Sequence, residues 1–223
     1  MTTRRSMSPA MEDTTRNRLL QAAERILVEQ GVHALTVRHV GKVADLNATL
    51  VTYHFGGVAQ LLAELCECNL AVMLRGWQAL DRQVAASEVD PVLKAWLAPL
   101  CAPAAFHPQG RAVIVLDEIA AHGSPEISAR LMDEMVGIAR RVQELLGPLL
   151  PHLSATELRA RLRFIAGAAL GPPPRVPSPE PAGPALDSLP YLLRFAAAAL
   201  DDRVKPAVRA AAGSRPSAEA SAG

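Results

Sequence analysis

Apolar residues recur three and four positions apart along most of this chain, which is the spacing of one face of an α-helix. The pattern begins with Leu19, Ala22, Ala23, Ile26 and Leu27. Runs of β-branched residues that would indicate strands are nearly absent. The one β-rich run, residues 112–116, fits a buried helix as well as a strand. The pattern therefore predicts an all-α fold of about nine helices.

Capping and breaking residues set the ends of these helices. Thr36 is a good N-cap, Gly123-Ser124-Pro125 ends one helix and starts another, and Ser154 with Glu157 forms a capping box. The expected helices are residues 15–30, 37–44, 47–53, 58–86, from 90 to a break at 103–108, 109–122, 125–150, 154–170 and 187–200.

Composition shifts divide the chain into four parts. Residues 1–13 are expected to be a disordered basic arm, and residues 14–60 a small N-terminal domain. Residues 61–202 form a larger helical bundle, interrupted by a proline-rich loop at 171–186 that cannot be helical. The Ala-, Pro- and Ser-rich residues 203–223 are expected to be a disordered tail.

The overall charge and the cysteines exclude several classes of protein. A net charge of +1 argues against a nonspecific nucleic-acid binder. No apolar run is long enough to span a membrane and no signal-peptide core follows the N-terminus, so we expect a cytoplasmic protein without a membrane partner. An odd count of 3 cysteines argues against a disulfide framework. Cys66 and Cys68 fall on different helix faces, which favours ordinary packing over a metal site.

Residues 36–55, TVRHVGKVADLNATLVTYHF, predict two short helices joined by a tight turn. Val37, Val40 and Val43 recur at helical spacing, Asp45-Leu46-Asn47 interrupts them, and Asn47 can cap the second helix. This arrangement, with short polar residues on the second helix, is typical of the helix-turn-helix that enters the DNA major groove. Many core helix pairs share the spacing, so the pattern alone leaves both interpretations open.

The specific residues resemble the N-terminal domain of TetR-family transcriptional regulators. The matching features are TRNRLLQAAERILVEQG (Thr15 to Gly31), Thr36-Val37-Arg38, a following alanine, and Tyr53-His54-Phe55-Gly56. The resemblance is close over residues 15–65 and only architectural beyond them. It implies a homodimeric regulator, here expected to be a repressor, that binds a palindromic DNA operator. A small hydrophobic or amphipathic effector would release it, and no cofactor is implied.

DNA contacts are expected on and beside the second helix of this motif, because its first turns face the base edges. The candidates are Arg38, Lys42, Asn47, Ala48, Thr49, Thr52, Tyr53 and His54. Asn47 can pair with an adenine edge, so a site containing A/T is expected, although Asn47 can also serve only as a cap. The resemblance implies phosphate contacts from Tyr53 and His54. Phe55 is expected to close the small core.

Three residues depart from the family pattern. Asp45 replaces the usual turn glycine, where a left-handed backbone is expected. Thr52 stands where many members have a phosphate-contacting tyrosine, and Val58 where they have a phosphate-gripping lysine. Each lost phosphate contact flattens the salt dependence of DNA binding by about 0.9 log units per log unit of salt, so a shallow dependence is expected.

The resemblance also implies an effector pocket and a dimer interface in the C-terminal bundle. The apolar pocket candidates, for which core packing is the alternative, are Met73, Trp77, Trp96, Val115, Ile119, Met135, Ile138 and Phe164. Runs of small residues in the last two helices favour close helix packing about a two-fold axis. The interface candidates, for which an intramolecular helix pair is the alternative, are Leu158, Leu162, Ile165, Ala169, Leu192, Leu193, Ala196 and Leu200.

An enzyme is the first competing interpretation, but the sequence contains no Gly-rich phosphate loop, metal-ligand cluster or nucleophile elbow. A helical partner-binding protein that no longer binds DNA is the second, because of Thr52 and Val58. An activator of the same fold, or a regulator without an effector, is the third.

Overall fold

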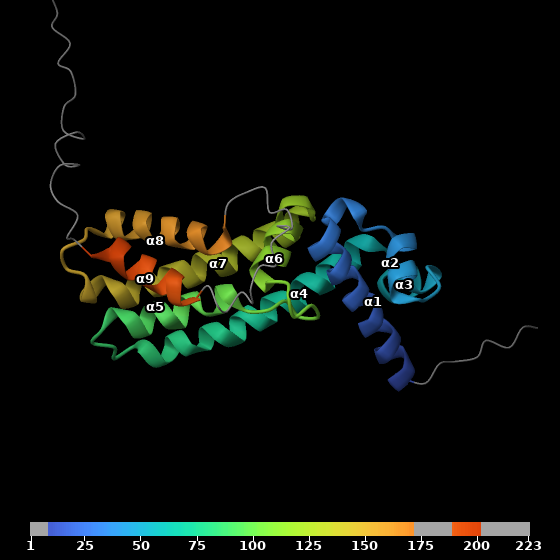
Figure 1. Cartoon of the computed structure of the whole chain (residues 1–223), viewed down its shortest axis with the longest axis horizontal. Coiled ribbons are helices and arrows are strands. Elements are labelled where there is room, and N and C mark those ends of the chain that lie inside the picture. The colour runs from blue at the N-terminus through green and yellow to red at the C-terminus, as the bar shows by residue number, and fades with distance from the viewer. Residues whose placement is uncertain (1–8, 172–188, 202–223) are drawn as a thin grey trace, which may run out of the picture.

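The computed structural model of the chain describes residues 9–171 and 189–201. The described residues form nine α-helices and four short 3-10 helices (Figure 1), without a strand beyond one isolated bridge between Pro103 and Arg111. The predicted all-α fold is therefore confirmed. The predicted tail and nearly all of the proline-rich loop lie outside the described residues, as do residues 1–8 of the predicted arm.

The elements follow the chain in this order: α1 (Pro9–Gln30), η1 (Val32–Ala34), α2 (Val37–Ala44), α3 (Thr49–Phe55), α4 (Val58–Trp77), η2 (Gln78–Gln83), α5 (Val89–Leu97), η3 (Pro99–Cys101), α6 (Ala112–His122), α7 (Pro125–Leu146), η4 (Gly147–Leu149), α8 (Ala155–Leu170) and α9 (Leu189–Leu200).

The predicted N-caps act as expected. Thr36 accepts a hydrogen bond from the backbone N–H of His39, Ser124 from Ile127, and Ser154 from Glu157. Several predicted boundaries differ from the structure by a few residues, and two of them differ more. Residues 9–13, expected in the arm, already belong to α1, and the expected helix over 58–86 ends at Trp77, where the chain tightens into the 3-10 helix η2.

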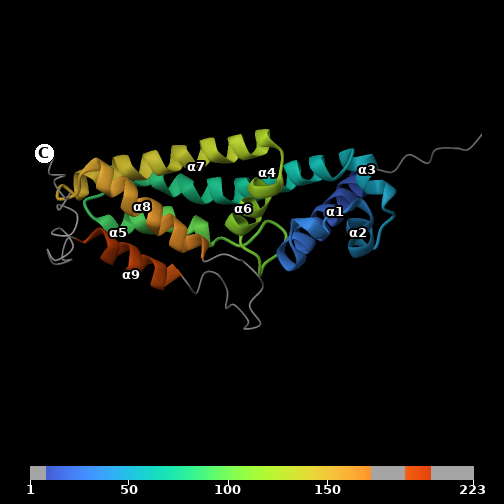
Figure 2. The same cartoon turned by 90° about the horizontal axis from the view of Figure 1, so that it is seen from above.

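The helices form an elongated molecule with a small domain at one end (Figures 1 and 2). We call residues 9–57, which hold α1 to α3, the head, and the described residues from 58 onward the body. Helix α4 packs against α1 and α3 of the head and then runs along the body, where it packs against α6. Helix α9 packs against α5 and α8 at the far part of the body. A single hydrophobic core runs through both parts.

A buried polar network joins the head to the body. The side chains of Glu24 on α1 and Asn69 on α4 are fully buried. The Asn69 amide donates to Glu24 Oε1 at 2.6 Å, and the backbone N–H of Phe106 donates to Glu24 Oε2 at 2.5 Å. Asn69 Oδ1 accepts from the N–H of Ala105 at 3.0 Å. Buried polar groups need such partners, so this network fixes the loop before α6 against both helices.

A second contact also joins the head to the body, because Glu118 Oε1 on α6 accepts a hydrogen bond from the backbone N–H of Val32 at 3.2 Å. No single helix of the described residues is long and apolar enough to cross a membrane. The pair Thr49–Phe55 and Val58–Gln83 passes that test only when joined across a 62° bend.

Candidate nucleic-acid interface

Helix α2 separates buried from exposed residues cleanly. Val40, Gly41 and Ala44 are buried on the face that packs against α1 and α3. Arg38 and Lys42 are exposed on the opposite face. The side-chain cap from Thr36 satisfies one N–H of the first turn, which stabilises a helix of only eight residues. Two cations are thus held on the outer surface of a short, fixed helix.

The turn after α2 adopts the left-handed conformation that was predicted for Asp45, with φ 52° and ψ 49°. The N–H of Leu46 donates to the carbonyl of Gly41 at 2.9 Å and closes the turn. Arg18 on α1 donates to the carbonyl of Ala44 at 2.7 Å and, more weakly, to that of Asp45 at 3.4 Å. The Arg18 cation therefore satisfies carbonyls at the α2 C-terminus and complements the negative end of its dipole.

Helices α2 and α3 meet at a contact that tolerates only glycine. A Cβ placed on Gly41 would lie 2.8 Å from the Cα of Ala48 and 2.9 Å from its backbone nitrogen. Because no side chain separates the two helices, the angle between them is set by direct backbone contact. Val51 and Phe55 complete the packing of α3, and both are buried. The predicted core role of Phe55 is confirmed.

The first turn of α3 is capped by Asn47. Its Oδ1 accepts from the backbone N–H of Thr49 at 2.9 Å and from the Thr49 hydroxyl at 2.8 Å. Asn47, Thr49 and Thr52 are exposed, and Tyr53 is 62% exposed. Ala48 is half-buried because it packs under Gly41. Six of the eight predicted DNA contacts, all except Ala48 and His54, therefore share the exposed surface of α2, the turn and α3.

His54 is placed differently from the other candidates. Its ring is half-buried, and its Nε2 has no contact with solvent and no hydrogen-bond partner among the described residues. The ring packs edge-on against Tyr53, with centroids 4.9 Å apart. In this conformation Nε2 does not reach the surface, so Tyr53 is better placed than His54 to contact a phosphate.

Two residues that hold this motif together, Arg18 and Gly41, were not predicted from the sequence. Arg18 appeared as one basic residue of an amphipathic helix, and its partner carbonyls lie 26 and 27 residues further along the chain. Gly41 lies between the valines that predicted this helix and is not part of their pattern. A glycine inside a short predicted helix is the one signal that indicated a close backbone approach.

None of the predicted pocket residues lines either of the two hollows described on the body, which are bordered by other residues of η2, α5 and α7. Met73, Trp77, Trp96, Val115 and Ile119 are buried in the core, and Met135 and Ile138 are half-buried. Phe164 is 66% exposed and does not belong to an interior site. The five buried residues belong to the hydrophobic core of the chain.

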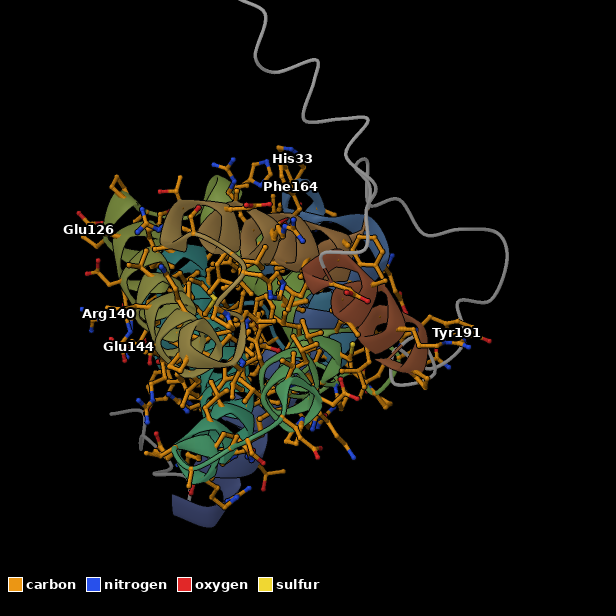
Figure 3. The ribbon with its side chains drawn as sticks, turned by 90° about the vertical axis from the view of Figure 1, so that its left-hand side faces the viewer. His33, Glu126, Arg140, Glu144, Phe164 and Tyr191 are labelled. Atoms are coloured by element: carbon orange, nitrogen blue, oxygen red, sulfur yellow. The ribbon has the colours of Figure 1, made fainter. Side chains whose placement is uncertain are left out.

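Most of the predicted dimer residues lie on the inward faces of α8 and α9, which fits the alternative interpretation of a helix pair within one chain. Six of them are buried within the single chain: Leu158, Leu162, Ile165, Ala169, Ala196 and Leu200. Leu192 and Leu193 are half-buried. An apolar stripe first covers a helix's own bundle, so the stripe identifies the core face. The outward faces carry Phe164 and Tyr191, which Figure 3 labels, and also Phe195. These three side chains are 66%, 68% and 50% exposed.

The cysteine thiols are buried or half-buried. All 3 cysteines are free, and burial raises the pKa of each thiol above its ordinary value. For Cys66 the pKa rises to about 11, mainly through burial, with a smaller contribution from the Glu67 charge and an opposing one from Arg130. Over the described residues, no three His, Cys, Asp or Glu side chains are placed to hold a metal ion.

Comparison with known proteins identifies the N-terminal part. Residues 19–65 match the model of a family described as bacterial regulatory proteins, tetR family. A search of curated proteins finds no match. Among solved structures, the chain is similar to SCO7518 from Streptomyces coelicolor A3(2), a proposed transcriptional regulator, at 23% identity over 82% of this chain and 98% of that chain, with a TM-score of 0.44.

A second solved structure, NalD, is the secondary repressor of the MexAB-OprM multidrug efflux pump in Pseudomonas aeruginosa. The chain is 17% identical to it over 87% of this chain and 99% of that chain, with a TM-score of 0.51, which supports the fold. The family match covers α2, α3 and the capped turn between them. Residues 19–65 therefore form a helix-turn-helix domain that matches the tetR family of bacterial regulatory proteins.

Proposed function

We propose that this chain is a homodimeric transcriptional repressor that binds a palindromic operator and leaves it when a small apolar or amphipathic effector binds. The observation that carries the proposal is the exposed surface formed by Arg38, Lys42, Asn47, Thr49 and Tyr53. These residues lie on a motif held rigid by the Asn47 cap and the Gly41 contact. A fixed polar helix surface flanked by cations is what major-groove recognition requires.

The proposed division of labour follows from the side-chain chemistry. Thr49 and Thr52 offer hydroxyl and methyl groups to base edges, and Asn47 offers its amide. Because Asn47 Oδ1 already caps α3, its amide nitrogen is the atom that remains for a base or phosphate oxygen. Arg38, Lys42 and Tyr53 serve the phosphate backbone, which positions the domain without reading sequence.

Dimerisation is proposed through the outward aromatic face of α8 and α9, made by Phe164, Tyr191 and Phe195. Large exposed aromatic side chains are expensive to leave in water and are enriched at protein interfaces. Arg163 lies over the Phe164 ring at 5.7 Å, and Arg194 over the Tyr191 ring at 5.0 Å. Two-fold packing of this face would bring two heads onto half-sites about one helical turn, or a multiple of it, apart.

Repression and effector control are the finer parts of the proposal. NalD, whose fold is similar, is a repressor. The Glu24–Asn69 network gives a route for control, because it ties the head to the loop before α6. An effector that binds one arrangement of head and body better than the other shifts the population, and DNA and effector then compete by linkage.

The test is selection of bound duplexes from a random DNA pool by the purified full-length protein, followed by salt titration on the enriched site. A palindromic enriched sequence with a shallow salt dependence is expected, because Thr52 and Val58 replace phosphate contacts. Thr49→Ala should relax the preference at its base pair by about 1–3 kcal/mol, whereas Lys42→Ala should weaken binding to every sequence alike. Absence of enrichment from a folded dimer would favour a partner-binding protein instead.

The dimer face has its own experiment. Phe164→Arg and Phe195→Arg should convert the dimer to a monomer in sedimentation velocity, because each places a charge in the proposed interface. Val84→Arg is the matched control, since Val84 is also an exposed hydrophobic residue, 69% exposed, but lies beside η2. A dimer that survives both phenylalanine changes would exclude this face.

A further inference from the structure

An apolar groove opens on the body where α4 gives way to η2. Its volume is about 500 Å³, within the range of roughly 300–1,000 Å³ usual for small-molecule sites. Four segments line it: the last turns of α4, η2, α5, and the chain that follows η3. The residues used below are Gly76, Ala79, Gln83, Lys94, Ala98 and Pro103.

Small residues create this groove. Gly76 approaches Pro99 so closely that a Cβ on Gly76 would lie 2.7 Å from the proline ring. On either side of this contact, Ala79 and Ala98 are too short to fill the space between α4 and α5. The result is a hollow with almost purely apolar walls, none of which belong to the residues predicted as a pocket.

One charged side chain lines the groove. Lys94 is exposed on α5, and no carboxylate within the described ranges lies within 4.0 Å of its ammonium group. Asp90, one helical turn earlier on α5, shares its face but forms no ion pair with it. Gln83 adds the only other polar side chain. An apolar trough with one unpaired cation complements a molecule with an apolar chain and a single anionic group.

We propose that this groove binds a small apolar molecule carrying one anionic group, such as a carboxylate, with Lys94 as the partner of that group. This inference rests on the proposed function, since it assigns a site and a chemical class to the effector. Apolar burial along Ala79 and Ala98 supplies affinity, and Lys94 supplies the preference for an anion.

The position of the groove connects it to the head. It lies where α4 changes to a six-residue 3-10 helix, and 3-10 segments of this length are uncommon and often mark hinges. Pro103 on its wall is close in sequence to Ala105 and Phe106, whose N–H groups are held by Asn69 and Glu24. A molecule in the groove therefore touches two segments that lead directly to the head.

Tryptophan fluorescence can report binding without DNA. The chain has 2 tryptophans: Trp77 follows Gly76, Trp96 follows Ala95 on the groove wall, and the Trp77 indole N–H donates to the carbonyl of Trp96 at 2.9 Å. Decanoate, decanol and decylamine, each below its micellar concentration, are the probes. Decanoate should give a saturable change, decanol should bind at least about tenfold more weakly, and decylamine should not bind. Equal affinity for all three would overturn the proposal.

Variants locate the site. Lys94→Glu should weaken decanoate binding at least about tenfold and leave decanol unchanged, Lys94→Arg should retain both, and Asp90→Asn should strengthen decanoate binding. Ala98→Phe should abolish binding of both probes by filling the groove. Arg140→Glu on the distant α7 is the control for a change of charge. Unchanged decanoate binding by Lys94→Glu or by a folded Ala98→Phe protein would disprove the site.

This experiment is independent of the regulator proposal. The titration needs no operator, so failure to enrich DNA would leave the result on Lys94 standing. Conversely, an enriched operator, together with decanoate binding that is the same in Lys94→Glu as in the wild type, would support the regulator proposal and exclude the groove as the binding site. Circular dichroism and thermal unfolding of Ala98→Phe establish that its loss of binding is not a loss of fold, and Lys94→Glu changes only an exposed residue.

Discussion

Asp45 holds the turn of the DNA-binding motif in a conformation that costs an L-residue about 1–2 kcal/mol, although Asp tolerates it better than most. Its φ of 52° is the only positive value among the described non-glycine residues. Asp45→Gly should therefore raise the free energy of unfolding by about 0.5–1 kcal/mol, measured by urea denaturation. The direction of this change is informative, because a substitution to glycine usually lowers the free energy of unfolding.

Asp133 supplies the control for Asp45. It is an exposed aspartate within α7, where the backbone is helical. Asp133→Gly should lower the free energy of unfolding by a few tenths of a kcal/mol up to about 1 kcal/mol, because glycine weakens helix interiors. If both glycine substitutions lower the free energy of unfolding, the strain at Asp45 is negligible.

The Cys66 thiol links stability to pH at the alkaline end. Burial raises its pKa from 9.0 to about 11, so between these values the folded protein keeps a proton that the unfolded chain has lost. The stabilisation is therefore complete below pH 9 and is lost as pH rises towards 11. Urea denaturation at pH 8 and 10.5 should show a fall in stability that is smaller in Cys66→Ala. The native thiol should also resist iodoacetamide at pH 8 until the protein unfolds. An equal fall in stability in the wild type and in Cys66→Ala would exclude this thiol as the cause of the pH dependence.

At the scale of helices, local chemistry made most ends predictable. Thr36, Ser124 and Ser154 cap the helices they were expected to cap, because an N-cap depends on bonds to residues three positions away. The end of α4 at Trp77 was not predictable. It lies beside the Gly76–Pro99 contact, and contacts between residues distant in sequence leave no periodic signal.

The contact between α2 and α3 yields a prediction with an opposite control. Gly41→Ala should destabilise the head by about 1–3 kcal/mol, because the new methyl group has no room against the Ala48 backbone. Gly137→Ala within α7 meets nothing within 4 Å and should stabilise by about 0.5–1 kcal/mol. Thermal unfolding of the two variants, with operator binding by Gly41→Ala, provides the measurement. Wild-type operator affinity in Gly41→Ala would mean that the helix angle is not set here.

For the whole molecule, the buried Glu24 carboxylate decides how head and body are joined. Both of its oxygens accept hydrogen bonds, so Glu24→Gln must turn an amide donor towards one of its donor partners. We expect a loss of about 1–3 kcal/mol of stability. The N–H groups of Ala105 and Phe106 should also exchange faster in hydrogen–deuterium exchange.

Glu29→Gln is the matched control for Glu24→Gln. Glu29 lies on the same helix and pairs with Arg25 at 3.0 Å on the surface. Exposed pairs contribute about 0–1 kcal/mol, so this variant should leave both stability and exchange near those of the wild type. Equal effects of the two variants would remove any special role for the buried network.

The sequence indicated the exposed side chains of α3 but not the residues that support this helix. Thr49 and Tyr53 were predictable because they belong to a motif that is contiguous in sequence. Glu24 and Arg18 act on backbone groups 82 and 26 residues away, and such pairings are decided only when the chain folds. The same reason explains the error at the dimer helices, since periodicity reveals a stripe but not what covers it.

Helix α4 has 20 residues, which makes it about 30 Å long. Because α4 continues from the head into the body, a tilt of this helix would displace the head at its first residue, Val58. A tilt of about 6° about its far end moves the near end by about 3 Å, roughly the rise of one base pair. A rotation of only a few degrees would thus be sufficient to move α3 out of register with a DNA major groove. In a symmetric dimer the α4 helices of both subunits would tilt. The change in the distance between the two heads would then be twice the displacement of one head.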